Sequence, residues 1–246
     1  MSLIPDLTKQ VALVTGGSRG LGRAIALALA EAGADVAVNY HGRADLAQEV
    51  AEAVRALGRR AITVAADVSK GAAVEALVSQ VTTELGPVDV LVNNAGIATI
   101  HGLEDLTEAE FDQTIAVNLK SAFLCTQAVL PAMRAQQWGR IVNISSGAAR
   151  GAGAIGVHYN ASKAGMEGLT RGYAARLVKE GITVNAVAPS LIETDMIRPR
   201  KDELAQRIPL GRLGTAEEVA QAVLMVVGNA YMTGQTIQLN GGMNFT

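Results

Sequence analysis

Among the 246 residues there is only one cysteine, Cys125, so no internal disulfide can form. A single thiol also provides no CxxC pair and none of the usual cysteine patterns of a zinc site. Aromatic residues make up only 3% of the chain, whereas apolar residues as a whole make up 49%. The core must therefore be built from Ala, Val, Leu and Ile. Small aliphatic residues at this density favour close packing of helices on a sheet.

Neither sign of charge is in excess. The 21 basic and 23 acidic residues give a formal net charge of -2, and no basic run is present. This composition argues against nucleic acid and anionic membrane surfaces as partners. No apolar run approaches the roughly 18 residues that a membrane helix requires, and the first ten residues lack the long apolar stretch of a signal peptide. We therefore expect a cytoplasmic protein with no nucleic-acid or membrane partner.

Short β-branched runs alternate with longer Ala- and Leu-rich segments of helical periodicity. The first six runs are apolar on both faces, as are parallel strands covered by helices. Gly33, Gly58, Gly86 and Gly181 each stand between a helical segment and the next strand, where a left-handed C-terminal cap is expected. The pattern predicts the α/β class, with a doubly wound Rossmann-type parallel sheet and helices on both faces. The seven predicted strands cover residues 11–15, 35–39, 61–66, 88–93, 140–145, 182–188 and 235–240.

No linker, repeat or low-complexity tract divides the chain, so we expect a single domain over residues 1–246. One long stretch, residues 189–214, lacks a regular pattern and contains Pro189, Pro199 and Pro209. A loop of this length within a compact domain usually has a function. We interpret it as a lid over a substrate site.

A glycine-rich turn of sequence TGGSRGLG, residues 15–22, joins the first predicted strand to the first predicted helix. A dinucleotide site needs a tight turn, a backbone that approaches the pyrophosphate, and a helix N-terminus facing that anion. The spacing here is GxxxGxG, and its position between a strand and a helix is the context that such a site requires. The turn is therefore predicted to bind a dinucleotide through Gly16, Ser18, Arg19, Gly20, Leu21 and Gly22.

Tyr159 and Lys163 begin a long helical segment and, being four positions apart, share one face of it. A phenol has a pKa near ~10, and a neighbouring ammonium lowers that pKa towards the working pH. Ser146 ends the preceding predicted strand, and the carboxyl ends of strands line the ligand crevice of such sheets. Its hydroxyl can hold a carbonyl oxygen beside the tyrosine. Ser145 is the competing serine, but strand alternation turns it to the opposite face.

These motifs, together with Asn118 and the NNAG sequence of residues 93–96, resemble the short-chain dehydrogenase/reductase family over essentially the whole chain. The resemblance implies that Tyr159 is the general acid/base and that Ser146 orients the substrate. It implies that Lys163 lowers the pKa of the tyrosine and holds the nicotinamide ribose. Asn118 resembles the asparagine that supports a proton relay through water.

The same resemblance implies cofactor contacts beyond the glycine-rich turn. Asn94, Ala95 and Gly96, after the fourth predicted strand, resemble the turn beside the adenosine half of the cofactor. Asp67 and Val68 resemble the pair that contacts the adenine. The expected set of cofactor contacts also includes Tyr159, Lys163 and, at the root of the lid, Pro189 and Thr194.

The sequence favours NADP(H) over NAD(H). An NAD site normally has an acid about 20 residues beyond the glycines, which binds the ribose hydroxyls. Asn39 stands in the expected place of that acid, so no carboxylate repels a 2′-phosphate there. Arg19 and Arg43 are available to pair with the phosphate, although Arg43 is explained equally well as a solvated residue at a helix start.

Within the family, residues 139–146, 181–185, 208–212 and 233–236 resemble bacterial 3-oxoacyl-[acyl-carrier-protein] reductases. The predicted function is an NADP(H)-dependent carbonyl reductase/alcohol dehydrogenase whose substrate is a 3-oxoacyl thioester. Many sugar, polyol and ketone dehydrogenases share these segments, so a small-molecule carbonyl substrate stays open. A third reading is an NADP(H)-binding sensor without catalytic activity, and the residues at the four predicted catalytic positions argue against it.

Binding of an acidic acyl carrier protein calls for a basic patch beside the active-site entrance. Two positions at which such reductases commonly have basic residues hold Gln137 and Glu180, with Arg134 and Lys179 nearby. The sequence therefore leaves open whether the carbonyl substrate is bound to a carrier protein. Ser190 also departs from the family, which usually has glycine there. The resemblance further implies a homotetramer.

Overall fold

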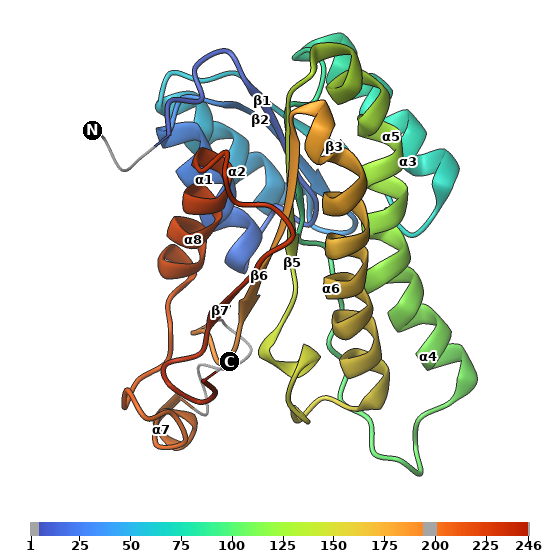
Figure 1. Cartoon of the computed structure of the whole chain (residues 1–246), viewed down its shortest axis with the longest axis vertical. Coiled ribbons are helices and arrows are strands. Elements are labelled where there is room, and N and C mark those ends of the chain that lie inside the picture. Colours follow the sequence, from blue (N-terminus) through green and yellow to red (C-terminus); the bar gives the residue numbers. More distant parts are fainter. Residues whose placement is uncertain (1–4, 194–200, 246) are drawn as a thin grey trace.

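The computed structural model describes residues 5–193 and 201–245 (Figure 1). Seven strands form one sheet in the order β3-β2-β1-β4-β5-β6-β7, and every neighbouring pair is parallel. This confirms the predicted doubly wound sheet. The strands are β1 (Val11–Val14), β2 (Asp35–Tyr40), β3 (Ala61–Ala65), β4 (Val90–Asn93), β5 (Gly139–Ile144), β6 (Ile182–Pro189) and β7 (Thr236–Leu239).

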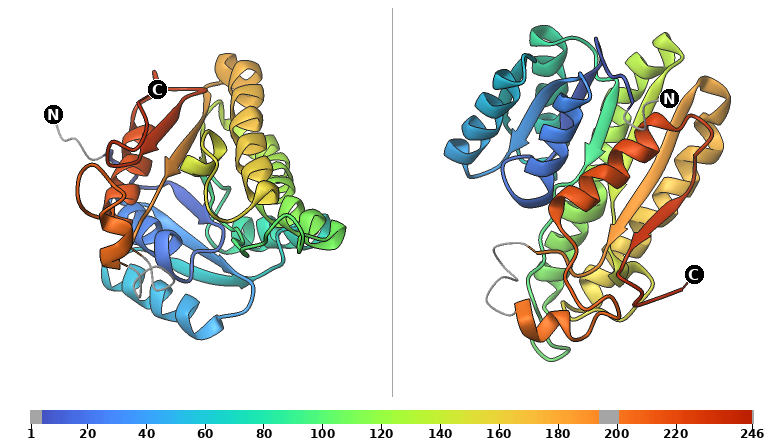
Figure 2. Two further views of the ribbon diagram at one scale, coloured as in Figure 1. Left: turned by 90° about the horizontal axis from the view of Figure 1, so that it is seen from below. Right: turned by 90° about the vertical axis from the view of Figure 1, so that its left-hand side faces the viewer.

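Two layers of helices bury the faces of the sheet (Figures 1 and 2). The helices α1 (Gly20–Glu31), α2 (Ala44–Ala56) and α8 (Ala216–Gly228) contribute to one apolar core cluster. The helices α3 (Gly71–Glu84), α5 (Ser121–Gln136) and α6 (Val157–Leu177) contribute to the other. β1, β4 and β5 are buried along their whole length, which explains their apolar character on both faces.

The order of the strands reverses between β1 and β4. In such sheets the carboxyl ends of the strands at this switch point border the ligand crevice. The glycine-rich turn follows β1, and Asn94, Ala95 and Gly96 follow β4. The fold thus places the two predicted cofactor segments side by side at the carboxyl ends of the neighbouring strands β1 and β4.

The glycines predicted to end helices have positive φ values, from 72° at Gly181 to 124° at Gly86. Gly181 has a second constraint, because a Cβ there would collide with the carbonyl oxygen of Gln137. The turn between α6 and β6 therefore requires glycine both for its backbone conformation and for its packing.

A continuous helix runs from Glu108 to Gln136 through α4 (Glu108–Ile115), a π-helical turn η1 (Ala116–Lys120) and α5. Its 29 residues are long and apolar enough to cross a membrane by length and composition alone. The inward face of α5 belongs to the core, because Cys125, Val129 and Met133 pack in the cluster beneath the sheet. A core helix passes the same test, so this is weak evidence for a membrane span. The sequence had indicated no such segment.

The described residues of the range 189–214 are more regular than predicted. Pro189 is the last residue of β6, a bridge joins Ile192 to Gly214, and α7 (Lys201–Ala205) follows. Residues 194–200, which include the predicted cofactor contact Thr194, lie outside the described residues. The described part of the predicted lid has its own small apolar cluster, formed by Leu204, Ile208 and Leu213 with Leu191 packed against it.

Candidate active site

The glycine-rich turn has the shape that a dinucleotide site requires. Gly16 and Gly20 have φ values of 60° and 53°, which favour glycine. A Cβ at Gly22 would collide with the carbonyl oxygen of Gly16, so the start of α1 packs directly on the turn. A Cβ at Gly20 would meet nothing within 4 Å, which shows open space above the helix N-terminus.

The N-terminus of α1 lacks the groups that usually satisfy it. Arg19 precedes the helix with an extended backbone and gives no side-chain cap, and no acidic residue lies in the first turn. The first backbone N–H groups of a helix need acceptors, and the helix dipole favours an anion there. These residues therefore fit the pyrophosphate of a dinucleotide. Ser18 lies within the turn, and the side chain of Leu21 packs partly against the core.

Asn94 joins the glycine-rich turn to the end of β4. Its side-chain amide donates to the carbonyl oxygens of Thr15 at 2.9 Å and Gly16 at 3.0 Å. The Thr15 hydroxyl accepts in return from the backbone N–H groups of Asn94 and Ala95, both at 3.0 Å. The two predicted cofactor segments are thus held together by four hydrogen bonds. Thr15 was not among the predicted site residues.

Asn39 lies elsewhere than predicted. Its side chain is buried, where the amide oxygen accepts from the Gly16 N–H at 3.3 Å and the amide nitrogen donates to the carbonyl oxygens of Val64 and Ala66, each at 3.2 Å. Strand alternation turns Asn39 inwards. The expectation that it lies beside the ribose is therefore corrected: Asn39 supports the glycine-rich turn from behind.

We expect Asn39→Asp to destabilise the fold rather than to alter cofactor choice. A carboxylate cannot donate, so it would face the carbonyl oxygens of Val64 and Ala66 unpaired. The free energy of unfolding should fall by about 3 kcal/mol, the upper end for an unsatisfied buried polar group. Chemical denaturation measures it. Asn229→Asp is the matched control, because the exposed Asn229 uses only its oxygen, which accepts from the Tyr231 N–H. Equal stabilities of the two variants would contradict the expectation.

The adenine-side residues lie beyond β3. Asp67 accepts from the hydroxyl and the N–H of Ser69 at 2.7 Å and 3.0 Å, and the side-chain bond from Ser69 holds the pKa of Asp67 below its usual value. Val68 is buried.

Of the two arginines predicted to be available for a 2′-phosphate, Arg43 is held by Asp45 in an exposed ion pair of 2.6 Å. This contact favours the interpretation of Arg43 as a residue at a helix start. In the described parts of the chain, Arg19 is exposed and makes no ion pair.

Ser146 and Tyr159 are brought together at the carboxyl edge of the sheet. β5 ends at Ile144, so Ser146 lies just beyond the strand, where its hydroxyl accepts from the Ala148 N–H at 3.2 Å. Burial raises the pKa of the Tyr159 phenol, and its hydrogen bond with Ser146 acts in the opposite direction. Ser145 points away as predicted, because its hydroxyl donates to the carbonyl oxygen of Lys163 at 3.2 Å.

Lys163 is buried next to the tyrosine. Its Nζ lies 5.8 Å from the centroid of the Tyr159 ring and donates to the carbonyl oxygen of Ile144 at 2.7 Å. Burial lowers the pKa of Lys163 to about 8. Desolvation of the phenol has the largest effect on the pKa of Tyr159 and raises it, whereas the expected lowering by this ammonium is not among the causes of the shift. A partly deprotonated lysine would also exert less of that effect.

Asn118 lies in the π-helical turn and is fully buried. Its amide binds the backbone of Ile97 twice, accepting at 2.7 Å and donating at 2.9 Å, and also donates to the Ser162 hydroxyl at 3.2 Å. A Cβ at Gly96 would lie 3.3 Å from the Asn118 Oδ1 and 3.8 Å from the Lys163 Nζ. Gly96, Asn118 and Lys163 therefore lie close together, and their chemical roles remain predictions.

Ser190 occupies its position without backbone strain, because it is not among the described residues with positive φ. Its hydroxyl lies 3.3 Å from the Met243 sulfur, and a Cβ at Gly147 would lie 3.4 Å from the Ser190 Cβ. Ser190 thus lies between the loop after Ser146 and the C-terminal segment.

We expect Ser190→Gly to fold and remain active, with a change mainly in the KM for the carbonyl substrate. Removal of the side chain opens space between Gly147 and Met243 but leaves the Ser190 N–H bonded to Leu239. The greater freedom of glycine should cost about 0.5–1 kcal/mol of stability. Steady-state kinetics and thermal denaturation test both points. Failure of the variant to fold would show that the hydroxyl is structural.

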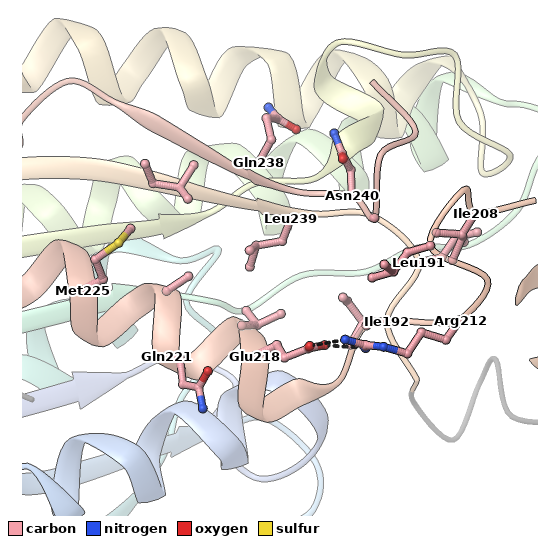
Figure 3. A pocket seen from close by; sticks show the side chains of 16 residues that line it. Leu191, Ile192, Ile208, Arg212, Glu218, Gln221, Met225, Gln238, Leu239 and Asn240 are labelled. Atoms are coloured by element: carbon pink, nitrogen blue, oxygen red, sulfur yellow. Dashed lines mark hydrogen bonds and ion pairs between the residues drawn. The ribbon is translucent and has the colours of Figure 1, made fainter. Parts of the chain in front are cut away.

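A cavity of about 610 Å³ lies apart from the predicted catalytic residues, between β7, α8 and the described part of the predicted lid (Figure 3). Apolar side chains such as Leu191, Ile192 and Leu239 line it, and an ion pair of 2.6 Å joins Arg212 to Glu218 at one side. None of the predicted catalytic residues lines this cavity.

Gln137 and Glu180 lie at the amino-terminal ends of the strands, whereas Ser146 lies at their carboxyl ends. Gln137 follows α5, Glu180 belongs to η3 (Val178–Glu180), and these segments precede β5 and β6. The six residues of β5 span about 20 Å at the usual rise per residue. Within one chain, these positions are therefore not beside the active-site entrance, contrary to expectation. Arg134 is not free to compensate, because it binds Glu180 at 2.6 Å.

The family model for short chain dehydrogenases matches residues 10–205. The chain belongs to the short-chain dehydrogenase/reductase family and is an NAD(P)(H)-dependent oxidoreductase acting on CH–OH and C=O groups.

It is 45% identical over 242 residues to the 3-oxoacyl-[acyl-carrier-protein] reductase FabG of Staphylococcus epidermidis, covering 94% of this chain and 98% of that protein. It is 43% identical over 241 residues to the 3-oxoacyl-[acyl-carrier-protein] reductase of Synechocystis, covering 96% and 98%. A crystal structure assigned as a short-chain alcohol dehydrogenase from Sinorhizobium meliloti 1021 has 35% identity and a TM-score of 0.91, covering 97% of each chain. The predicted resemblance is confirmed.

Proposed function

We propose that the protein is an NADP(H)-dependent reductase of 3-oxoacyl thioesters. The observation that carries the proposal is the grouping of Ser146, Tyr159 and the buried Lys163, whose Nζ lies 5.8 Å from the centroid of the Tyr159 ring, at the carboxyl edge of the sheet where the glycine-rich turn also lies. Similarity to two 3-oxoacyl-[acyl-carrier-protein] reductases supports the substrate class.

In the proposed reaction, the substrate carbonyl oxygen accepts hydrogen bonds from the Ser146 hydroxyl and the Tyr159 phenol. A bound nicotinamide cofactor supplies the hydride. Tyr159 donates its proton to the oxygen as negative charge develops there, which is general acid catalysis. The raised pKa of Tyr159 keeps the phenol protonated before the reaction. Reduction of a ketone is the direction that needs this form.

Lys163 and Asn118 are proposed to return a proton to the tyrosine. Lys163, with its pKa lowered to about 8, is able both to give and to accept a proton near neutral pH. Asn118 holds the Ile97 backbone and the Ser162 hydroxyl in place next to it. The Ser162 hydroxyl in turn donates to the Tyr159 carbonyl oxygen at 2.7 Å, which fixes the first turn of α6.

The proposal is tested by NADPH oxidation with a substrate panel. The panel contains a 3-oxoacyl thioester and small ketones, while several sugars and polyols are assayed in the reverse direction by reduction of NADP⁺. We expect the highest kcat/KM for the thioester. A sugar or a small ketone as the best substrate would replace the proposed substrate class. Cofactor binding without turnover on any of them would favour the sensor interpretation.

A carrier-bound substrate is also part of the proposal, since the two relatives are carrier-protein reductases by name. The slightly negative net charge gives little long-range attraction to an acidic carrier. A carrier-bound substrate and a small thioester analogue should therefore have similar kcat/KM values. A preference of several orders of magnitude for the carrier-bound form would show a docking surface other than the predicted positions.

We further propose a cytoplasmic homotetramer. Among the described residues β7 pairs only with β6, which leaves one edge of β7 open beside the cavity of Figure 3. Met225 and Leu210 on the cavity lining are 44% and 61% exposed, so a second copy covering this face would bury apolar surface. Light scattering should give four times the chain mass of 25.5 kDa. A monomeric mass would contradict it.

A further inference from the structure

The loop that follows Ser146 has few side chains that could fix its shape. Residues 147–156 have the sequence GAARGAGAIG, with four glycines and four alanines. Glycine has the largest conformational freedom of all residues, and alanine provides no polar side chain. The loop must therefore be held from outside if the adjoining Ser146 is to keep one position.

Asn160 holds this loop. Its Nδ2 donates to the carbonyl oxygens of Ala148 at 2.9 Å, Gly151 at 2.7 Å and Ala152 at 2.7 Å. All three acceptors lie in the loop, and the two amide hydrogens are shared among them. One side chain on α6, immediately after Tyr159, thus binds the loop at its beginning and in its middle.

A second contact fastens the loop further along the same helix. Arg150 Nε donates to the carboxylate of Glu167 at 3.0 Å, and the Glu167 side chain is buried. Asn160 and Glu167 are seven residues apart, about two helical turns, so they share one face of α6. The loop therefore lies along the face of α6 that carries Asn160 and Glu167, and Asn160 directly follows Tyr159 in the chain.

Ala148 connects Asn160 to the proposed chemistry. Its carbonyl oxygen accepts from Asn160, while its N–H donates to the Ser146 hydroxyl at 3.2 Å. The Ser146 hydroxyl is the hydrogen-bond partner of the Tyr159 phenol. We propose that Asn160 is a positioning residue for the reaction, which acts through Ala148 to hold the Ser146 hydroxyl against the Tyr159 phenol. This inference rests on the proposed roles of Ser146 and Tyr159.

The test is Asn160→Leu, which keeps the size and the neutral charge of the side chain but removes both donors. We expect kcat to fall about tenfold or more, the factor that corresponds to one net hydrogen bond. The Kd for NADPH, measured by fluorescence, should stay unchanged because the glycine-rich turn is untouched. Asn160→Gln, which retains the donors on a longer arm, should recover part of kcat.

The pH profile separates positioning from a purely structural role. In the oxidation direction the tyrosine acts as base, so kcat/KM rises with pH through its pKa. Loss of the Ser146 bond removes the influence that lowers the Tyr159 pKa. The rising limb should therefore move to higher pH in Asn160→Leu. Lys163, the neighbouring charged group on α6, is unchanged by this substitution.

Asn244→Leu is the matched control, and it makes the same chemical change on the other side of the loop. Asn244 is exposed, and its amide would lie 3.9 Å from a Cβ at Gly151.

The proposal is overturned if Asn160→Leu keeps the wild-type kcat and pH limb. It is also overturned if Asn160→Leu is less stable to heat but its folded fraction has the wild-type kcat and the wild-type pH dependence of kcat/KM. Tyr159→Phe, measured in parallel, separates the two levels of the argument. An active Tyr159→Phe would remove the proposed function itself. An inactive Tyr159→Phe beside an unaltered Asn160→Leu would remove only the role of Asn160.

Discussion

Tyr159→Phe is expected to lower kcat by at least ~100-fold, the usual scale for loss of a general acid. The substitution removes only the phenolic hydroxyl, and hence both the transferable proton and the hydrogen bond with Ser146. The aromatic ring, which lies 5.8 Å from the Lys163 Nζ, is retained. NADPH binding should therefore survive, and stopped-flow and steady-state assays of NADPH oxidation measure the loss.

The chain offers a matched control on the same helix. Tyr173 also lies on α6, and its hydroxyl accepts from Gln127 at 2.8 Å, away from the glycine-rich turn. Tyr173→Phe makes the same chemical change and should keep kcat within about twofold, as expected for a group outside the reaction. If the two variants lost activity equally, the loss would reflect α6 and not proton transfer. Near-normal turnover of Tyr159→Phe would disprove the assignment of Tyr159 as the acid.

The sequence predicted the sheet well for a physical reason. Parallel strands covered on both faces are continuous apolar runs, and the first six of the seven predicted strands are such runs. Four of the seven are preceded by a predicted glycine cap. The predicted strands at residues 35–39 and 182–188 differ from β2 and β6 by one residue at the C-terminal end. The π-helical turn at Ala116–Lys120 was not predicted. Such a turn differs from an α-helix in hydrogen bonding and not in composition.

The error at Asn39 has a specific cause. A shift of one residue along a strand turns a side chain to the opposite face. The sequence spacing pointed to the end of β2 but could not fix which residue faces the crevice. The structure turns Asn39 inwards, where its amide serves the Gly16 N–H and two carbonyl oxygens of the β3 side. Tyr40 and His41, which follow it, are more exposed than Asn39.

Asn160 shows a different limit. In the segment from Tyr159 to Lys163, the residue types at the two ends indicate chemistry, whereas Asn160 has no such pattern in the sequence. Its three acceptors are backbone oxygens of a Gly- and Ala-rich loop, so no partner side chain marks the contact in the sequence. Only the folded loop shows what it binds.

Arg19→Ala is expected to remove much of a preference for NADPH over NADH. Arg19 is exposed at the N-cap of α1, next to the open space above Gly20, and makes no ion pair within the described chain. Arg43, the other candidate, is held by Asp45. A charge-assisted contact with the 2′-phosphate of ~1.5–3 kcal/mol corresponds to roughly 10- to 150-fold in affinity. The Kd for NADPH should rise by that factor, while the Kd for NADH should change little.

Arg23→Ala is the matched control for this prediction. Arg23 is exposed one turn further along α1, where its N–H donates to the Arg19 carbonyl oxygen at 3.2 Å. The substitution Arg23→Ala removes an equal charge at the same end of the protein. A general electrostatic effect should therefore raise the Kd for NADPH in both variants. Loss of a direct contact with the 2′-phosphate should raise it only in Arg19→Ala. The Arg19 effect should also shrink as the salt concentration rises, because exposed charges are screened. A wild-type protein that binds NADH more tightly than NADPH would refute the proposed cofactor preference outright. Equal losses in the two variants would show that the 2′-phosphate senses the charge of α1 and not Arg19 itself.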